Sequence, residues 1–114
     1  MDKVAKLKKY QRILREVIER HAQMPGEPAQ IESFAVCDAV HDHYLLIDVG
    51  GNANGFAHDV VVHLRLQNGK VRVVWDGIEY GIAQDLIEAG IPSADIVMPF
   101  AQPETVAWPE LAAA

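Results

Sequence analysis

The first segment of the chain has apolar residues at helical spacing. From Asp2 to about Gln23 they recur every three or four positions, and basic residues occupy many of the positions between them. This pattern predicts one long amphipathic helix over residues 1–23. The Met24-Pro25-Gly26-Glu27-Pro28 segment then ends the helix, because proline and glycine disrupt helical geometry and hydrogen bonding.

Residues 29–76 alternate between β-forming residues and turn residues, which predicts an antiparallel sheet. Asn68-Gly69 is the clearest hairpin signal, since both residues tolerate the positive φ of a type I′ turn. The glycine-rich run from Gly50 to Gly55 is predicted to be a flexible hairpin loop. The four expected strands cover approximately residues 30–40, 43–49, 56–67 and 70–75.

Residues 79–98 are predicted to form short helices. Ile82, Ala83, Leu86 and Ile87 make an apolar stripe that stops at Gly90. Ser93 is expected to cap one further helical turn that runs as far as Val97. Residues 99–114 carry three prolines and an alanine-rich end, and they are expected to be an extended tail. The chain is therefore predicted to be one two-layer α+β domain over residues 1–114, with helices on one face of a four-stranded meander.

Such a sheet leaves its second face without a cover. Within residues 56–67 we expect Val60, Val62, Leu64 and Leu66 to face the core, because side chains alternate along a strand. Contiguous apolar positions on the other face are typical of an interface, so we expect self-association, with a dimer as the simplest form. The interface candidates are Leu45, Val49, Val61, Val74 and Trp75.

Charge and cysteine content narrow the function classes. The net charge of −6 disfavours unaided binding to a phosphate backbone, which depends on lysine and arginine. Cys37 is the only cysteine, so the chain has no internal disulfide and suits a reducing cytoplasm. No stretch has the apolar length of a signal peptide core or of a membrane-spanning helix.

A histidine group is the main candidate for chemistry. His41, His43 and His63, together with Asp38 or Asp42, could form a metal site of a small hydrolase. Histidines in a turn and on strand surfaces account for the same pattern, and this interpretation is favoured because two histidines at this spacing occur readily by chance. We therefore expect no metal, no cofactor and no catalytic residues. A further hypothesis places Lys6, Lys8 and Lys9 of a dimer against DNA.

Several segments resemble the XisI family in their order along the chain. They are Asp42-His43-Tyr44-Leu45-Leu46 with Val49-Gly50, then Val62-His63-Leu64, then Asn68-Gly69-Lys70-Val71, then residues 82–92 (IAQDLIEAGIP) with Asp95-Ile96-Val97 and Phe100. The chain departs from the family pattern at Gly51, where a tryptophan is expected, and in the C-terminal tail.

The XisI family is named for a controlling factor needed for excision of the fdxN element in heterocyst-forming cyanobacteria. The resemblance implies an accessory, non-catalytic role in DNA recombination. It also implies a companion protein, XisH, whose fold is similar to that of endonucleases. The chain is accordingly expected to act through protein contacts, as a homo-oligomer and with an XisH-like companion.

Overall fold

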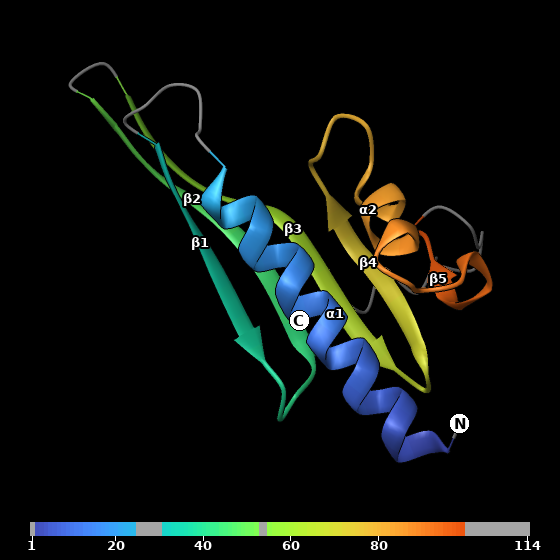
Figure 1. The fold of residues 1–114 in the computed structure, drawn as a ribbon. Coiled ribbons are helices and arrows are strands. Elements are labelled where there is room, and N and C mark those ends of the chain that lie inside the picture. Colours follow the sequence, from blue (N-terminus) through green and yellow to red (C-terminus); the bar gives the residue numbers. More distant parts are fainter. Residues whose placement is uncertain (1, 25–30, 53–54, 100–114) are drawn as a thin grey trace, which may run out of the picture.

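The structure is a computed structural model, and it describes residues 2–24, 31–52 and 55–99. An N-terminal helix lies across a mixed sheet, and a short second helix packs beside it (Figure 1). None of the described helices is both long enough and apolar enough to cross a membrane. The elements are α1 (Lys3–Gln23), β1 (Ile31–Asp38), β2 (His43–Asn52), β3 (Gly55–Gln67), β4 (Lys70–Asp76), α2 (Ile82–Glu88), the 3₁₀ turn η1 (Ser93–Asp95) and β5 (Ile96–Val97).

Helix α1 confirms the long amphipathic helix that the apolar spacing predicts. Its N-terminus is capped by Asp2, whose carboxylate accepts a hydrogen bond of 2.7 Å from the backbone N–H of Ala5. One face of the helix is buried against the sheet, and its polar face carries the lysines and arginines. The buried residues of α1 are Tyr10, Ile13, Leu14, Val17, Ile18 and His21.

The sheet has five strands in the order β1-β2-β3-β4-β5. The first four form the predicted antiparallel meander. The fifth corrects the prediction of four strands, because Ile96 and Val97 pair in parallel with Val71 and Arg72 of β4. Asn68 and Gly69 join β3 to β4 with φ of 52° and 75°, as a type I′ turn requires.

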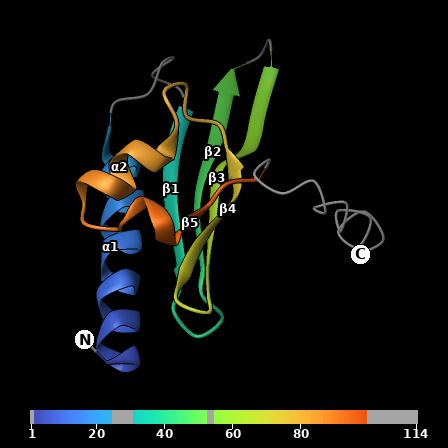
Figure 2. The same ribbon diagram turned by 90° about the vertical axis from the view of Figure 1, so that its right-hand side faces the viewer.

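Both helices lie on the same face of the sheet (Figure 2). The core lies between these two layers, and its sheet side consists of buried side chains of β2, β3 and β4. The far ends of β2 and β3 extend beyond α1 (Figure 1). The sheet residues of the core are Tyr44, Leu46, Val62, Leu64, Leu66, Val71 and Val73.

The segment after β4 is organised by Asp76. One carboxylate oxygen accepts the backbone N–H of Ile78, and the other accepts that of Ile82, the first residue of α2 (both 3.0 Å). Gly90 follows α2 with φ of 116°, which explains why the helix stops there. The predicted further turn is a 3₁₀ turn over Ser93–Asp95, but Pro92 and not Ser93 is its N-cap residue.

The glycine-rich run is shorter as a loop than the sequence predicts. Strand β2 continues through Gly50 and Gly51 to Asn52, and β3 begins at Gly55. Cross-strand hydrogen bonding therefore orders most of the predicted loop. The predicted extended tail, residues 99–114, lies outside the described residues except for Pro99.

Candidate interaction face

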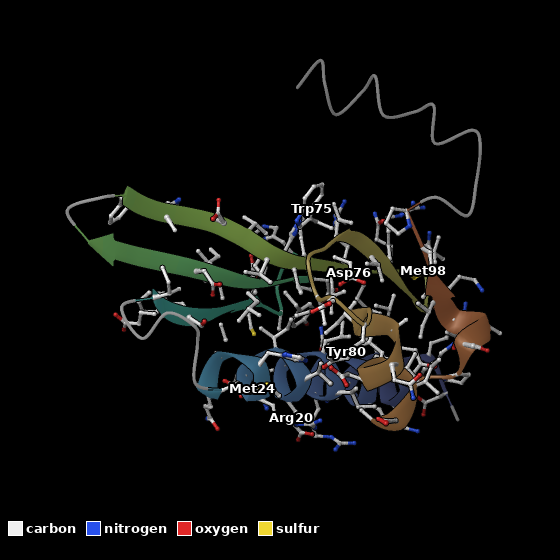
Figure 3. All side chains as sticks on the ribbon, turned by 90° about the horizontal axis from the view of Figure 1, so that it is seen from above. Arg20, Met24, Trp75, Asp76, Tyr80 and Met98 are labelled. Carbon is white, nitrogen blue, oxygen red and sulfur yellow. The ribbon has the colours of Figure 1, made fainter. Side chains whose placement is uncertain are left out.

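The face of the sheet opposite α1 and α2 is not covered by any described element; we call it the open face. Trp75 projects from it, on the side away from α1 (Figure 3). Cross-strand pairing places side chains in rows across this face, because paired residues point the same way. Three of these rows run from β1 toward β4. The first row is Asp38, His43, Arg65 and Arg72, the second is Val36, Leu45, His63 and Trp75, and the third is Phe34, Ile47 and Val60.

The middle of the open face is apolar and exposed. Phe34, Val36 and Val60 keep 42%, 45% and 41% of their surface exposed, and Trp75 keeps 60%. Large apolar side chains at the centre of a sheet are normally buried, and a contiguous exposed group of them is typical of an interaction surface. Leu45 and Ile47 lie between them and are half-buried.

Two β-bulges decide which residues belong to this face. One lies where Leu46 pairs with Val62 but Ile47 pairs with Val60, so Val61 has no cross-strand partner in β2. Val61 packs against the core instead, and the prediction that it lies opposite the core is wrong. Val60, predicted to face the core, is 41% exposed. An extra residue in one strand reverses the alternation beyond it.

The second bulge lies between β3 and β4. Leu64 pairs with Val73, and His63 pairs with Trp75, so Val74 is the unpaired residue. Trp75 therefore leaves the phase of Val71 and Val73 and becomes exposed. The register also places Leu45 and Val49 on the open face. Of the five interface candidates, Leu45, Val49 and Trp75 therefore lie on the open face by register, whereas Val61 and Val74 are the bulge residues.

One end of the open face carries positive charge. Arg65 and Arg72 are paired across β3 and β4, although like charges opposite each other are unfavourable. Among the described residues no carboxylate lies within ion-pair distance of either guanidinium. The Nε atom of Arg65 is buried without a hydrogen-bond partner. The positive charge of the two guanidinium groups suits this end of the open face to an anionic partner.

The structure brings together only part of the predicted histidine group. Nδ1 of His43 lies 3.0 Å from Nε2 of His63, and burial, His43 and Arg65 lower the pKa of His63. His41 is not part of this pair. Its Nδ1 lies 2.8 Å from Asp38, and this bond is the main reason that the pKa of the Asp38 carboxyl is lowered.

The other predicted ligands are occupied elsewhere. Asp42 accepts hydrogen bonds from Gln11 (2.9 Å) and from the hydroxyl of Tyr44 (3.1 Å). Within residues 2–24, 31–52 and 55–99 no three histidine, cysteine, aspartate or glutamate side chains are grouped as metal ligands. The positive charge of Arg65 beside the His43–His63 pair also disfavours a cation there. The described geometry gives the hydrolase alternative no support.

Two aspartates on the helix side, which sequence reasoning left without a role, join distant segments. Asp85 lies 2.5 Å from Nε2 of His21 and accepts 2.8 Å from the hydroxyl of Tyr80. Asp95 accepts hydrogen bonds from the hydroxyl of Tyr10 (2.5 Å) and pairs with Lys6 (3.2 Å). In the sequence, the only signal of such a contact is that His21 lies within the apolar stripe of α1, because a buried histidine needs a polar partner.

A surface pocket of about 260 Å³ lies between α1 and the β1–β2 hairpin. Lys8, Arg12 and Arg15 line it beside Cys37. Burial raises the pKa of the Cys37 thiol, Glu19 raises it further, and Arg15 opposes them. The thiol is therefore protonated near neutral pH, which does not suit a nucleophile.

The fold and the open face define a small two-layer α+β protein with one uncovered, partly apolar sheet face. The model of the family described as XisI protein matches residues 1–113, and the chain belongs to that family. This confirms the resemblance seen in the sequence.

Two solved structures share the fold. An XisI-like protein from Anabaena variabilis is 23% identical, with a TM-score of 0.76 over 87% of this chain and 91% of the other. The fdxN element excision controlling factor XisI from the same organism is 26% identical, with a TM-score of 0.70 over 88% of this chain and 97% of the other. No curated protein matches the chain. The family and this relative support a regulatory role.

Proposed function

We propose that this protein is a non-catalytic regulatory factor that controls excision of a DNA element through protein contacts made by its open face. It self-associates and binds an XisH-like companion protein. The observation that carries the proposal is the exposure of Phe34, Val36, Val60 and Trp75 at the centre of an uncovered sheet face. A family relative described as an excision controlling factor supplies the biological context.

Charge supports a role through proteins instead of direct DNA recognition. The chain has a net charge of −6, whereas DNA affinity depends on displacing counterions with cations. Two of the basic residues of α1 are already engaged: Lys6 pairs with Asp95, and Arg12 pairs with Glu16 at 3.9 Å. In this proposal a separate site-specific recombinase supplies DNA recognition, and this protein alters the activity of that recombinase.

The test uses a reporter that carries the element and its recombinase, with the excised product quantified in the presence and absence of this protein. Val36→Glu places a charge in the centre of the open face, and it is expected to abolish the effect. Val40→Glu is the matched control, because Val40 is 84% exposed in the β1–β2 turn, away from the apolar rows. Excision that is the same with and without the wild-type protein contradicts the regulatory role.

The companion is tested separately with a purified XisH-like protein. Tagged wild-type chain and the Val40→Glu control are expected to retain it at micromolar concentrations. Val36→Glu is expected to lose it, because in this proposal the companion recognises the self-associated form that the open face makes. Light scattering on the same samples reports self-association. Retention by Val36→Glu at wild-type strength would remove the open face from the proposal.

A further inference from the structure

The row of the open face nearest the β1–β2 turn has an acid at one end and bases at the other. It begins with Asp38 on β1 and ends with Arg65 and Arg72 on β3 and β4. Neighbouring strands lie about 4.8 Å apart, so about 14 Å separates Asp38 from Arg72 across the face. Such a surface is complementary to itself when a second copy faces it with the order of its strands reversed, so that β1 of one copy lies over β4 of the other.

Only some symmetry axes produce that match. A half-turn about an axis parallel to the strands, between β2 and β3, exchanges β1 with β4 and β2 with β3. This arrangement also keeps the strands of the two sheets roughly aligned, as packed sheets prefer. A half-turn about an axis across the strands instead lays β1 on β1 and brings Asp38 over Glu32, which sets acid against acid.

We propose that a second copy of this chain covers the open face about a two-fold axis parallel to the strands, with Asp38 of each copy paired with Arg72 of the other. This inference rests on the proposed function, in which the protein self-associates, and it names the surface and the symmetry. Each dimer then holds two such ion pairs, one at each side of the interface.

The same rotation also matches the apolar rows. Val36 lies over Trp75 of the second copy, and Phe34 lies near its Val60 across the next row. These four exposed side chains would then be removed from water, which stabilises the association by about 25 cal/mol for each Å² of apolar surface buried. The ion pairs fix the orientation, because a wrong orientation opposes like charges.

The exposed carboxylate of Asp38 remains available for this pairing. Its Oδ1 accepts the backbone N–H groups of Val40 and His41, and its Oδ2 contacts His41. Oδ1 uses both of its lone pairs on the two backbone groups, whereas Oδ2 keeps one further lone pair, and 42% of the side chain is exposed. Arg72 has no carboxylate within ion-pair distance among the described residues, so its guanidinium is available as well.

The experiment is a charge exchange between two variants. Asp38→Lys and Arg72→Glu each place two like-charged pairs in the homodimer, and each is expected to raise the dimer dissociation constant at least about tenfold. Mixing the two variants restores opposite charges at both pairs in the mixed dimer. Sedimentation velocity with one variant carrying a fusion tag is expected to show a mixed dimer as strong as wild type.

Two controls separate charge from folding. Asp38→Asn keeps the Oδ1 acceptor for the turn and removes the charge, so it is expected to weaken the dimer less than Asp38→Lys does. Arg12→Glu changes a cation on α1, outside the open face, and is expected to leave the dimer unchanged. Circular dichroism and thermal unfolding establish that each variant folds.

Three outcomes overturn the inference. Weak homodimers that mixing does not restore show that the two-fold axis is wrong, although self-association stands. A wild-type chain that is monomeric at all concentrations but still binds the companion and changes excision removes the second copy and leaves the regulatory role. A chain that dimerises through this face only after residues 100–114 are deleted shows that its own C-terminal segment is the occupant.

Discussion

Nε2 of His21, near the end of α1, lies 2.5 Å from the carboxylate of Asp85 in α2. This contact joins the two helices, and His21 is the only buried polar side chain among the described residues. The carboxylate also accepts the hydroxyl of Tyr80, so one aspartate satisfies two groups. The arrangement fixes α2 against α1 on the covered face of the sheet.

The first prediction concerns this contact. His21→Ala leaves Asp85 without its buried partner and is expected to lower the free energy of unfolding by about 1–3 kcal/mol. Asp85→Asn is expected to have a smaller effect, because the amide keeps one hydrogen-bonding oxygen. Urea unfolding of both single variants and the double variant measures the coupling. Additive losses would show that the two side chains do not interact.

The second prediction concerns alkaline pH. Burial is the main cause that raises the pKa of Tyr10 to about 12, and its hydrogen bond to Asp95 raises it further. A phenol whose pKa is raised in the folded state stabilises the fold below its unfolded pKa, near 10. That contribution is lost as pH rises from about 10 toward 12.

Stability is therefore expected to fall over this alkaline range, and Tyr10→Phe is expected to reduce the fall. Burial is also the main cause of the raised pKa of Tyr44. For Tyr80, the hydrogen bond to Asp85 is the main cause of the raised pKa. Tyrosinate absorbance of the native protein, measured as a function of pH, checks that the pKa values of these tyrosines are raised. Full ionisation of the tyrosines near pH 10 without unfolding would contradict these raised pKa values.

The third prediction concerns the bulge in β3. Val61 packs against the core and Val60 is 41% exposed, although the two are neighbours. Val61→Asp is expected to lower thermal stability by several degrees, because it buries a charge. Val60→Asp is expected to change stability little and to weaken self-association. The opposite ranking in thermal unfolding would place the bulge elsewhere.

The fourth prediction concerns Gly51, where the family pattern leads one to expect tryptophan. Its φ is 144°, and a Cβ atom there would lie 2.2 Å from the carbonyl oxygen of Gly55. Gly51→Ala is therefore expected to destabilise the end of the β2–β3 hairpin by more than 1 kcal/mol. Gly55→Ala is the matched control, since nothing lies within 4 Å of its Cβ position. Equal stability of both variants in thermal unfolding would show that Gly51 can be replaced.

Much of the fold follows from local patterns in the chain. The spacing of apolar residues in α1, the Asn68-Gly69 turn and the break at Gly90 each depend on a few adjacent residues, and the structure confirms them. The fifth strand could not be predicted in this way. Ile96 and Val97 form a strand only because the chain returns to the edge of β4, and a two-residue segment carries no periodicity of its own.

The open face itself depends on tertiary structure. The sequence determined that the helices cover one side of a sheet and leave the other side with apolar residues. It did not determine which valines lie on which side, because Val60, Val61 and Val74 are equally suited to a core or a surface strand position. The pairing of β3 with its two neighbours introduces two bulges, and each adds one residue that reverses the alternation of side chains beyond it.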